Sequence, residues 1–153
     1  MEYRACPTAV IEAPIDRVWT LLTNPAGWGD FFDLRITKVD PAGMAIVGQR
    51  VEAESGPRLL HIKLNIEFKE IDASNFGINM IVNLPLGIKV REELRCIPLG
   101  LDRCRVTYGC NFELPNGWRG AVASLFVGRK FNNGPRDSLS RLKRAAELGF
   151  NSL

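Results

Sequence analysis

Hydrophobic and polar residues alternate through the middle of the chain, and this alternation predicts antiparallel strands. The period of two is clearest from Leu60 to Phe68, where every second residue is apolar, as in a strand with one buried face. It recurs in Phe76 to Val82, Leu86 to Cys96 and Cys104 to Leu114, separated by short connections rich in turn residues. Weaker strands are expected over Arg35–Val39 and Arg50–Glu54, which with an N-terminal strand gives about seven.

Apolar residues spaced by three and four predict helices near both ends of the chain. Ile15, Val18, Trp19 and Leu22 follow a strand that ends at Ile11, and Asn24-Pro25 stops the helix. A second such pattern runs from Trp118 to Leu148. Gly134-Pro135 interrupts it, so either a kinked helix or two helices must result, and we expect a kinked one.

The order of these elements predicts an α+β protein, because the strands are gathered instead of alternating with helices. The 153 residues suit one domain spanning 1–153, and the composition does not change along the chain. No apolar run approaches the roughly 20 residues that cross a bilayer. Residues 1–7 lack a secretory signal, so a cytoplasmic location is expected.

Several short motifs carry a resemblance to a known superfamily. These are Ala13-Pro14, Val18-Trp19 and Trp28, supported by Val47-Gly48-Gln49 and by Leu139-Ser140-Arg141-Leu142-Lys143. The chain resembles the START/Bet v 1-like (SRPBCC) superfamily, in particular its polyketide cyclase/dehydrase-like group. The resemblance implies a helix-grip fold, in which a curved antiparallel sheet wraps a long C-terminal helix around a ligand cavity, with two short helices after the first strand.

Within that fold, the inward side chains of the late strands and of the terminal helix are the candidate ligand contacts. They are Ile62, Leu64, Ile66, Ile78, Met80, Val90, Glu92, Val106, Tyr108, Cys110, Phe112, Leu125 and Arg129. Most are apolar, which favours a small hydrophobic, polyketide-like or lipid-like ligand.

Three of these residues are polar enough to direct a ligand or a proton. Glu92 shares the face of Val90 and Leu94, which would bring a carboxylate into an apolar space, unless a β-bulge turns it to solvent. Tyr108 could bond a ligand or simply fill the core. Arg129 falls near the centre of the helix stripe and could bind a ligand carboxylate or pair with Glu92, or extend to water.

Other chemistries lack the residues that they need. Cys6, Cys96, Cys104 and Cys110 have no metal-binding spacing, and packed free thiols are expected, although Cys96 and Cys104 could face each other across a hairpin. His61 shares the polar face of its strand, so we expect it in solvent. Hydrolase, phosphate-loop and metalloprotease motifs are also absent. We therefore expect neither a metal nor a cofactor.

The C-terminal segment is basic, with seven cations against two carboxylates. They are Arg119, Arg129, Lys130, Arg136, Arg141, Lys143 and Arg144, against Asp137 and Glu147. This segment could meet an anionic ligand, a membrane or nucleic acid. A solvated helix face is favoured over a nucleic-acid surface, because aromatic residues are not interleaved among the charges.

Three functions remain open from the sequence. The first is binding of a hydrophobic ligand in the cavity. The second is a cyclase or dehydratase in which Glu92 or Tyr108 transfers protons, as the resemblance implies for parts of the group. The third is an interaction module that docks a partner on the cavity rim and the basic helix. The pattern says nothing about the oligomeric state.

Overall fold

The computed structural model describes residues 2–56, 61–130 and 133–150, and the side chains of all of these except 2–3, 126–130 and 149–150. The described residues form eight strands in one antiparallel sheet. The strands are β1 (Glu2–Ala5), β2 (Thr8–Ile11), β3 (Arg35–Asp40), β4 (Arg50–Ser55), β5 (Ile62–Asp72), β6 (Gly77–Asn83), β7 (Lys89–Pro98) and β8 (Cys104–Glu113). The predicted class is therefore confirmed, and Leu60, the expected start of β5, lies outside the described residues.

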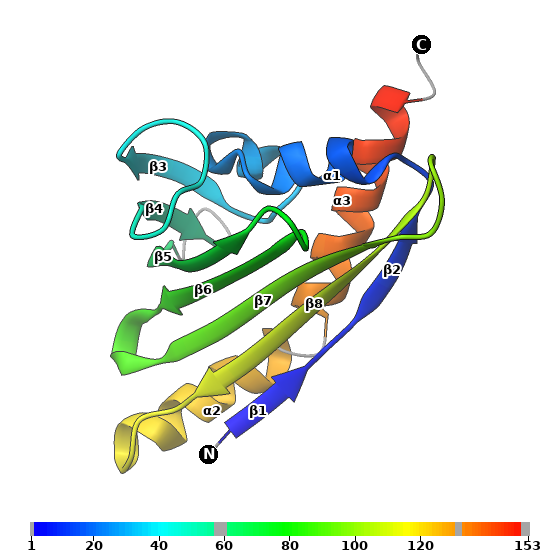
Figure 1. Cartoon of the computed structure of the whole chain (residues 1–153). Helices are drawn as coiled ribbons and strands as arrows, with labels where there is room; N and C mark the ends of the chain where they lie inside the picture. The colour runs from blue at the N-terminus through cyan, green and yellow to red at the C-terminus, as the bar shows by residue number, and fades with distance from the viewer. Residues whose placement is uncertain (1, 57–60, 131–132, 151–153) are drawn as a thin grey trace.

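The sheet order is β1-β8-β7-β6-β5-β4-β3, and β2 also pairs with β8 (Figure 1). The N-terminal segment thus forms two strands instead of one, which makes eight where about seven were expected. Glu2 to Ala5 pair with one half of β8, and Thr8 to Ile11 pair with the other. Cys96 lies opposite Val106, so it does not face Cys104 directly, and all four cysteines are free.

Two short helices follow β2, as expected. In α1 (Ile15–Leu22), Pro14 precedes the first turn and Val18 and Leu22 are fully buried, because the spacing of four places them on one face. Then η1 (Pro25–Asp30), a 3-10 helix, buries Trp28, whose indole Nε1 donates to the Leu22 carbonyl at 3.1 Å. This hydrogen bond fixes Trp28 against α1.

The C-terminal segment forms two helices, α2 (Trp118–Lys130) and α3 (Gly134–Phe150). The expectation of one kinked helix was therefore wrong. Pro135 stands in the first turn of α3, where its missing N–H has no helical partner to lose, so it starts a helix instead of bending one. No helix among the described residues is both long and apolar enough to span a membrane.

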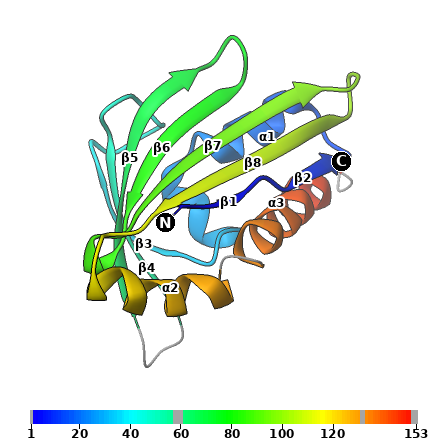
Figure 2. The same cartoon turned by 90° about the horizontal axis from the view of Figure 1, so that it is seen from below.

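The helices lie on the concave side of the sheet (Figure 2). The second half of α3 packs against β2 and α1, where Arg17 Nε donates to the Ala146 carbonyl at 2.7 Å and Lys143 Nζ to that of Val10 at 2.9 Å. The first turns of α3 and the whole of α2 lie farther along, toward the start of β7 and the end of β8 (Figure 2). Different elements therefore cover the two ends of the sheet. The site lies at the end that the second half of α3 does not cover.

Candidate functional site

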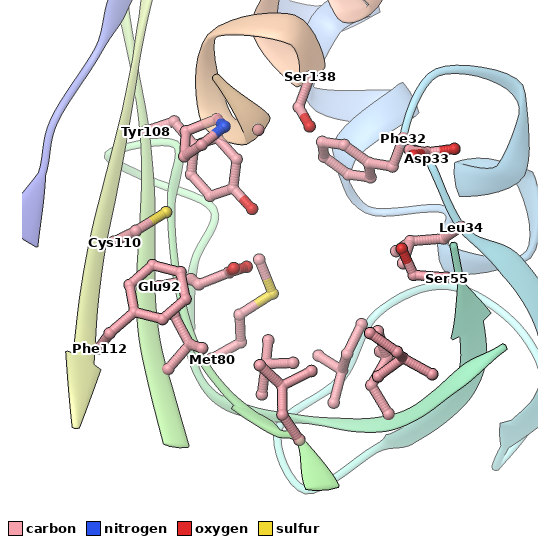
Figure 3. A pocket seen from close by; sticks show the side chains of 18 of the residues that line it. Phe32, Asp33, Leu34, Ser55, Met80, Glu92, Tyr108, Cys110, Phe112 and Ser138 are labelled. Atoms are coloured by element: carbon pink, nitrogen blue, oxygen red, sulfur yellow. The ribbon is translucent and has the colours of Figure 1, made fainter. Parts of the chain in front are cut away.

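A cavity of about 570 Å³ lies between the concave sheet face, the segment after η1 and the first turns of α3 (Figure 3). Its walls are mostly apolar. The sheet contributes Ser55, Ile62, Leu64, Ile66, Met80, Val82, Val90, Glu92, Tyr108, Cys110 and Phe112. Trp28, Phe32, Asp33 and Leu34 come from η1 and the segment after it, and the start of α3 contributes Pro135, Asp137, Ser138 and Arg141.

Glu92 and Tyr108 place a carboxyl group and a phenol side by side inside the cavity. Glu92 lies opposite Met80 on β6 and Cys110 on β8 in an unbroken register, so no bulge turns it outward. Its neighbours Arg91 and Glu93 are exposed on the other face. Tyr108 precedes Cys110 by two residues and therefore shares this face. Both side chains point into the cavity (Figure 3), and the Tyr108 hydroxyl donates a hydrogen bond to the Glu92 carboxylate.

Burial controls the protonation of this pair. It raises the pKa of Glu92 to about 7, and the hydrogen bond from Tyr108 only partly opposes that rise. Burial, followed by the negative charge of Glu92, raises the pKa of Tyr108 well above its ordinary value. Burial likewise raises the pKa of the Cys110 thiol. Near neutral pH, Tyr108 and Cys110 are therefore neutral, while Glu92 exchanges between its two forms.

This arrangement can do two things chemically. A protonated Glu92 can donate a hydrogen bond to a ligand carbonyl or hydroxyl oxygen, and an ionised Glu92 can accept one. Because its pKa lies near neutrality, the same carboxyl can also give or take a proton. Tyr108 holds the carboxyl in place from the neighbouring strand.

Polar side chains gather where the cavity opens. Arg141 and Asp33 form an ion pair of 3.8 Å between Nη1 and Oδ1 across the gap between α3 and the segment after η1. Asp137 and Ser138 line the same part of the cavity. Both partners of the pair are well exposed, so this mouth is in contact with water. An apolar chamber thus leads to a polar rim.

The structure places most of the candidate ligand contacts on this cavity. Nine of them line it: Ile62, Leu64, Ile66, Met80, Val90, Glu92, Tyr108, Cys110 and Phe112.

Three candidates lie elsewhere. Ile78 and Val106, 1% and 0% exposed, are packed in the core beside Leu94 and Cys96, because α1 and α3 cover that end of the sheet. Leu125 is 76% exposed on α2, because a separate α2 does not continue the α3 stripe over the sheet. The Arg129 side chain lies outside the described residues. His61 is exposed, as expected.

Several lining residues were not found from the sequence. Phe32, Asp33 and Leu34 follow η1 in an irregular segment, which has no periodicity to read. Arg141 was named as part of a basic helix and of a family motif, but not as a cavity residue. A prediction would have required the position of α3 relative to η1. Among the described residues, no three His, Cys, Asp or Glu side chains are grouped so that they could hold a metal ion.

Comparison with known proteins agrees with this architecture. A family described as "Polyketide cyclase / dehydrase and lipid transport" matches residues 7–147. No curated protein sequence is significantly similar to the chain.

Solved structures share the fold at low sequence identity. A norcoclaurine synthase point mutant from Thalictrum flavum has 15% identity and a TM-score of 0.72, over 99% of this chain and 97% of that one. The Zhui aromatase/cyclase from Streptomyces sp. R1128 has 16% identity and a TM-score of 0.70, over 94% and 95%. Ara h 8.0201 has 8% identity and a TM-score of 0.69, over 95% and 98%. The fold is therefore the Bet v 1-like helix grip, and the chain belongs to the polyketide cyclase/dehydrase and lipid transport family.

Proposed function

We propose that the chain binds a small hydrophobic molecule, polyketide-like or lipid-like, in the cavity between the sheet and α3. The observation that carries the proposal is an apolar cavity of about 570 Å³ with one carboxyl–phenol pair converging on its interior. Ligand pockets have this size and composition, with apolar walls for affinity and few polar groups for orientation. Glu92 and Tyr108 would orient the ligand, and the walls would exclude water.

The comparisons support a ligand of moderate size. The plant synthase has been solved in complex with dopamine and hydroxybenzaldehyde, and the Streptomyces relative is an aromatase/cyclase. These are properties of those proteins, and because this chain shares their fold, we expect a ligand of similar dimensions here.

The binding proposal is tested by filling the cavity. Val82 lines it, whereas its neighbour Ile81 lies on the opposite face of β6. We expect Val82→Trp to weaken binding of the fluorescent probe 1-anilinonaphthalene-8-sulfonate at least about tenfold, because the indole occupies the ligand space. Ile81→Trp is the matched control and should bind the probe as the unmodified chain does. Equal binding by all three proteins would refute the proposal.

Native mass spectrometry of the purified chain provides a direct second measurement. A retained molecule of lipid-like or polyketide-like mass, released on denaturation, would support a binding role. The same molecule should be missing from Val82→Trp and present in Ile81→Trp. Its persistence in Val82→Trp would show that it is bound outside the cavity.

A second function, proton transfer, is favoured by the raised pKa of Glu92. In a cyclisation, the ionised carboxyl would remove a proton from a carbon between two carbonyl groups, and that carbon would attack another carbonyl carbon. The protonated carboxyl would then return the proton to the resulting alkoxide oxygen, which becomes a hydroxyl group. For dehydration, the ionised carboxyl would remove the second proton from the same carbon and give it to the departing hydroxyl, so that a carbon–carbon double bond forms and water leaves. Tyr108 would position the carboxyl during both steps.

This second function is tested with a poly-β-ketone chain made in situ by a minimal polyketide synthase. The unmodified chain should change the ratio of cyclised aromatic products measured by mass spectrometry. Glu92→Gln should reduce that effect about a hundredfold or more, as for loss of a general acid–base, while still binding the naphthalene probe. An unchanged product ratio with Glu92→Gln would exclude this role and leave binding intact.

A further inference from the structure

The outer side of α2 exposes large apolar residues beside a cation. Trp118 is 71% exposed and Leu125 is 76% exposed, and the Arg119 guanidinium lies 5.8 Å from the centre of the Trp118 ring. On the adjacent turn η2 (Pro85–Gly87), Leu86 is 41% exposed and also lines the cavity. Trp118 and Leu125 belong to no core cluster of the described residues, so the core does not account for them.

The charged residues in the segment that contains α2 are all positive. From Leu114 to Arg136 the chain contains no aspartate or glutamate and four cations, which are Arg119, Arg129, Lys130 and Arg136. The whole chain carries only +3, so the rest of the molecule is close to neutral. The positive charge is therefore concentrated in the segment that also exposes Trp118 and Leu125.

The inner side of α2 lies against residues that line the cavity. Ala123 is fully buried on Ile88, with Leu84 and Phe112 beside it, and all three of these contacts belong to the cavity wall. Phe112 lies near the end of β8, and Ile88 directly precedes β7. A single helix therefore separates this end of the cavity from the exposed apolar side chains.

We propose that α2 docks on the surface of an anionic lipid bilayer. Trp118 and Leu125 would enter the interface between headgroups and acyl chains, and Arg119 would lie among the phosphates. Exposed tryptophan and leucine together with arginine and lysine are the combination by which interfacial helices bind anionic membranes. Nucleic acid fits less well, because Trp118 is the only exposed aromatic ring among the α2 side chains that the structure describes.

This surface gives the cavity a position relative to the membrane. With α2 on the bilayer, the walls formed by Leu84, Ile88 and Phe112 lie next to the lipid surface. Docking itself does not depend on the ligand proposed above, so the two proposals can fail separately.

Vesicle sedimentation with the full chain tests the proposal. We expect binding to vesicles of phosphatidylcholine and phosphatidylserine, weaker binding at high salt, and little binding to phosphatidylcholine alone. Trp118→Ser and Leu125→Ser should each weaken binding about tenfold, because each removes an apolar side chain that would be buried in lipid. Leu101→Ser is the matched control: Leu101 is 92% exposed in the turn between β7 and β8, and its loss should have no effect.

Tryptophan emission provides a readout of the same contact. Trp28 is fully buried and Trp19 packs on Phe76, so a blue shift on adding vesicles would report Trp118. Trp118→Phe should retain most of the binding and lose the shift.

Three results would overturn the proposal. They are equal binding to anionic and zwitterionic vesicles, undiminished binding by the Trp118→Ser/Leu125→Ser double variant, and a dimer in free solution that the double variant dissociates. Unchanged naphthalene-probe binding by the double variant would show that its cavity is intact, so a loss of vesicle binding could not be attributed to misfolding.

Discussion

The two halves of the concave sheet face differ in what covers them. In one half, Ile78, Leu94 and Val106 lie under α1 and the second half of α3 and are at most 1% exposed. In the other half, Leu64 and Met80 face the cavity. Both halves come from the same strands with the same alternation of residues. The alternation therefore decides which face is turned inward, and the covering helices decide whether that face is packed or lines an open space.

Aromatic side chains form the boundary between the two halves. Trp28 packs on Phe68 with ring centroids 5.5 Å apart and on Phe32 at 5.4 Å, and Phe32 reaches Tyr108 at 6.2 Å. Phe68 belongs to the packed core, whereas Trp28, Phe32 and Tyr108 line the cavity. These rings are stiff and large, so they support the cavity wall from the packed side.

The largest expected effect on stability comes from a substitution in the packed half of the sheet. Leu94 is fully buried on β7, so Leu94→Ala removes packed atoms and leaves a new void. We expect a loss of about 3 to 5 kcal/mol in the free energy of unfolding, measured by urea denaturation. A loss below about 1 kcal/mol would show that this half is not tightly packed.

The next effect depends on pH and concerns Glu92. Its pKa of about 7 lies above the ordinary carboxyl value of 4.5, so between these pH values the folded state binds more protons than the unfolded one. Stability from this group therefore falls as pH rises, by at most about 3 kcal/mol, and the loss is complete above about pH 7.

Glu92→Gln cannot titrate and should remove this dependence. Urea unfolding of both proteins at pH 5 and pH 8 should show the variant gaining stability relative to the unmodified chain as pH rises. A parallel pH profile for the two proteins would contradict the raised pKa of Glu92.

A smaller loss of stability is expected when a leucine is replaced by alanine in the half that faces the cavity. Leu64, 9% exposed on β5, already faces the cavity. Leu64→Ala therefore enlarges an existing space and loses mainly transfer free energy, about 1 to 2 kcal/mol by urea denaturation. If it costs as much as Leu94→Ala, the difference between the two halves does not exist.

The smallest effect is expected at the mouth. The Arg141–Asp33 pair is exposed on both sides, so Arg141→Met should change the free energy of unfolding by less than about 0.5 kcal/mol. The same substitution should weaken binding of the negatively charged naphthalene probe about threefold, because a cation at the rim is lost. Calorimetric titration would measure this, and tighter probe binding would contradict it.

Much of this arrangement could be predicted from the sequence, because strand periodicity states which residues share a face. That argument put Glu92 and Tyr108 on the inner side with Met80. It could not separate Ile78 and Val106 from the cavity wall, since both kinds of position have the same pattern. The sequence did not show at which residue of each strand the cover by α1 ends and the cavity begins.

The two ends of the terminal segment show the same limit. Gly134-Pro135 correctly marked an interruption, but a proline is compatible with both a bend and a helix start. The choice depended on tertiary packing, and the separation of α2 from α3 moved Leu125 from the expected cavity wall to the surface. The ion pair between Arg141 and Asp33 depended on the same packing.

The pairing of both β1 and β2 with β8 has a consequence for how the protein folds during synthesis. The Thr8 hydroxyl contacts that of Thr107, 99 residues later, and the Pro7 carbonyl accepts from the Tyr108 amide at 2.9 Å. At about 5 to 20 residues per second, a ribosome needs about 5 to 20 seconds to make the partner of the first strands. Until then β1 and β2 have no strand to pair with in the nascent chain, so their addition to the edge of the sheet comes late.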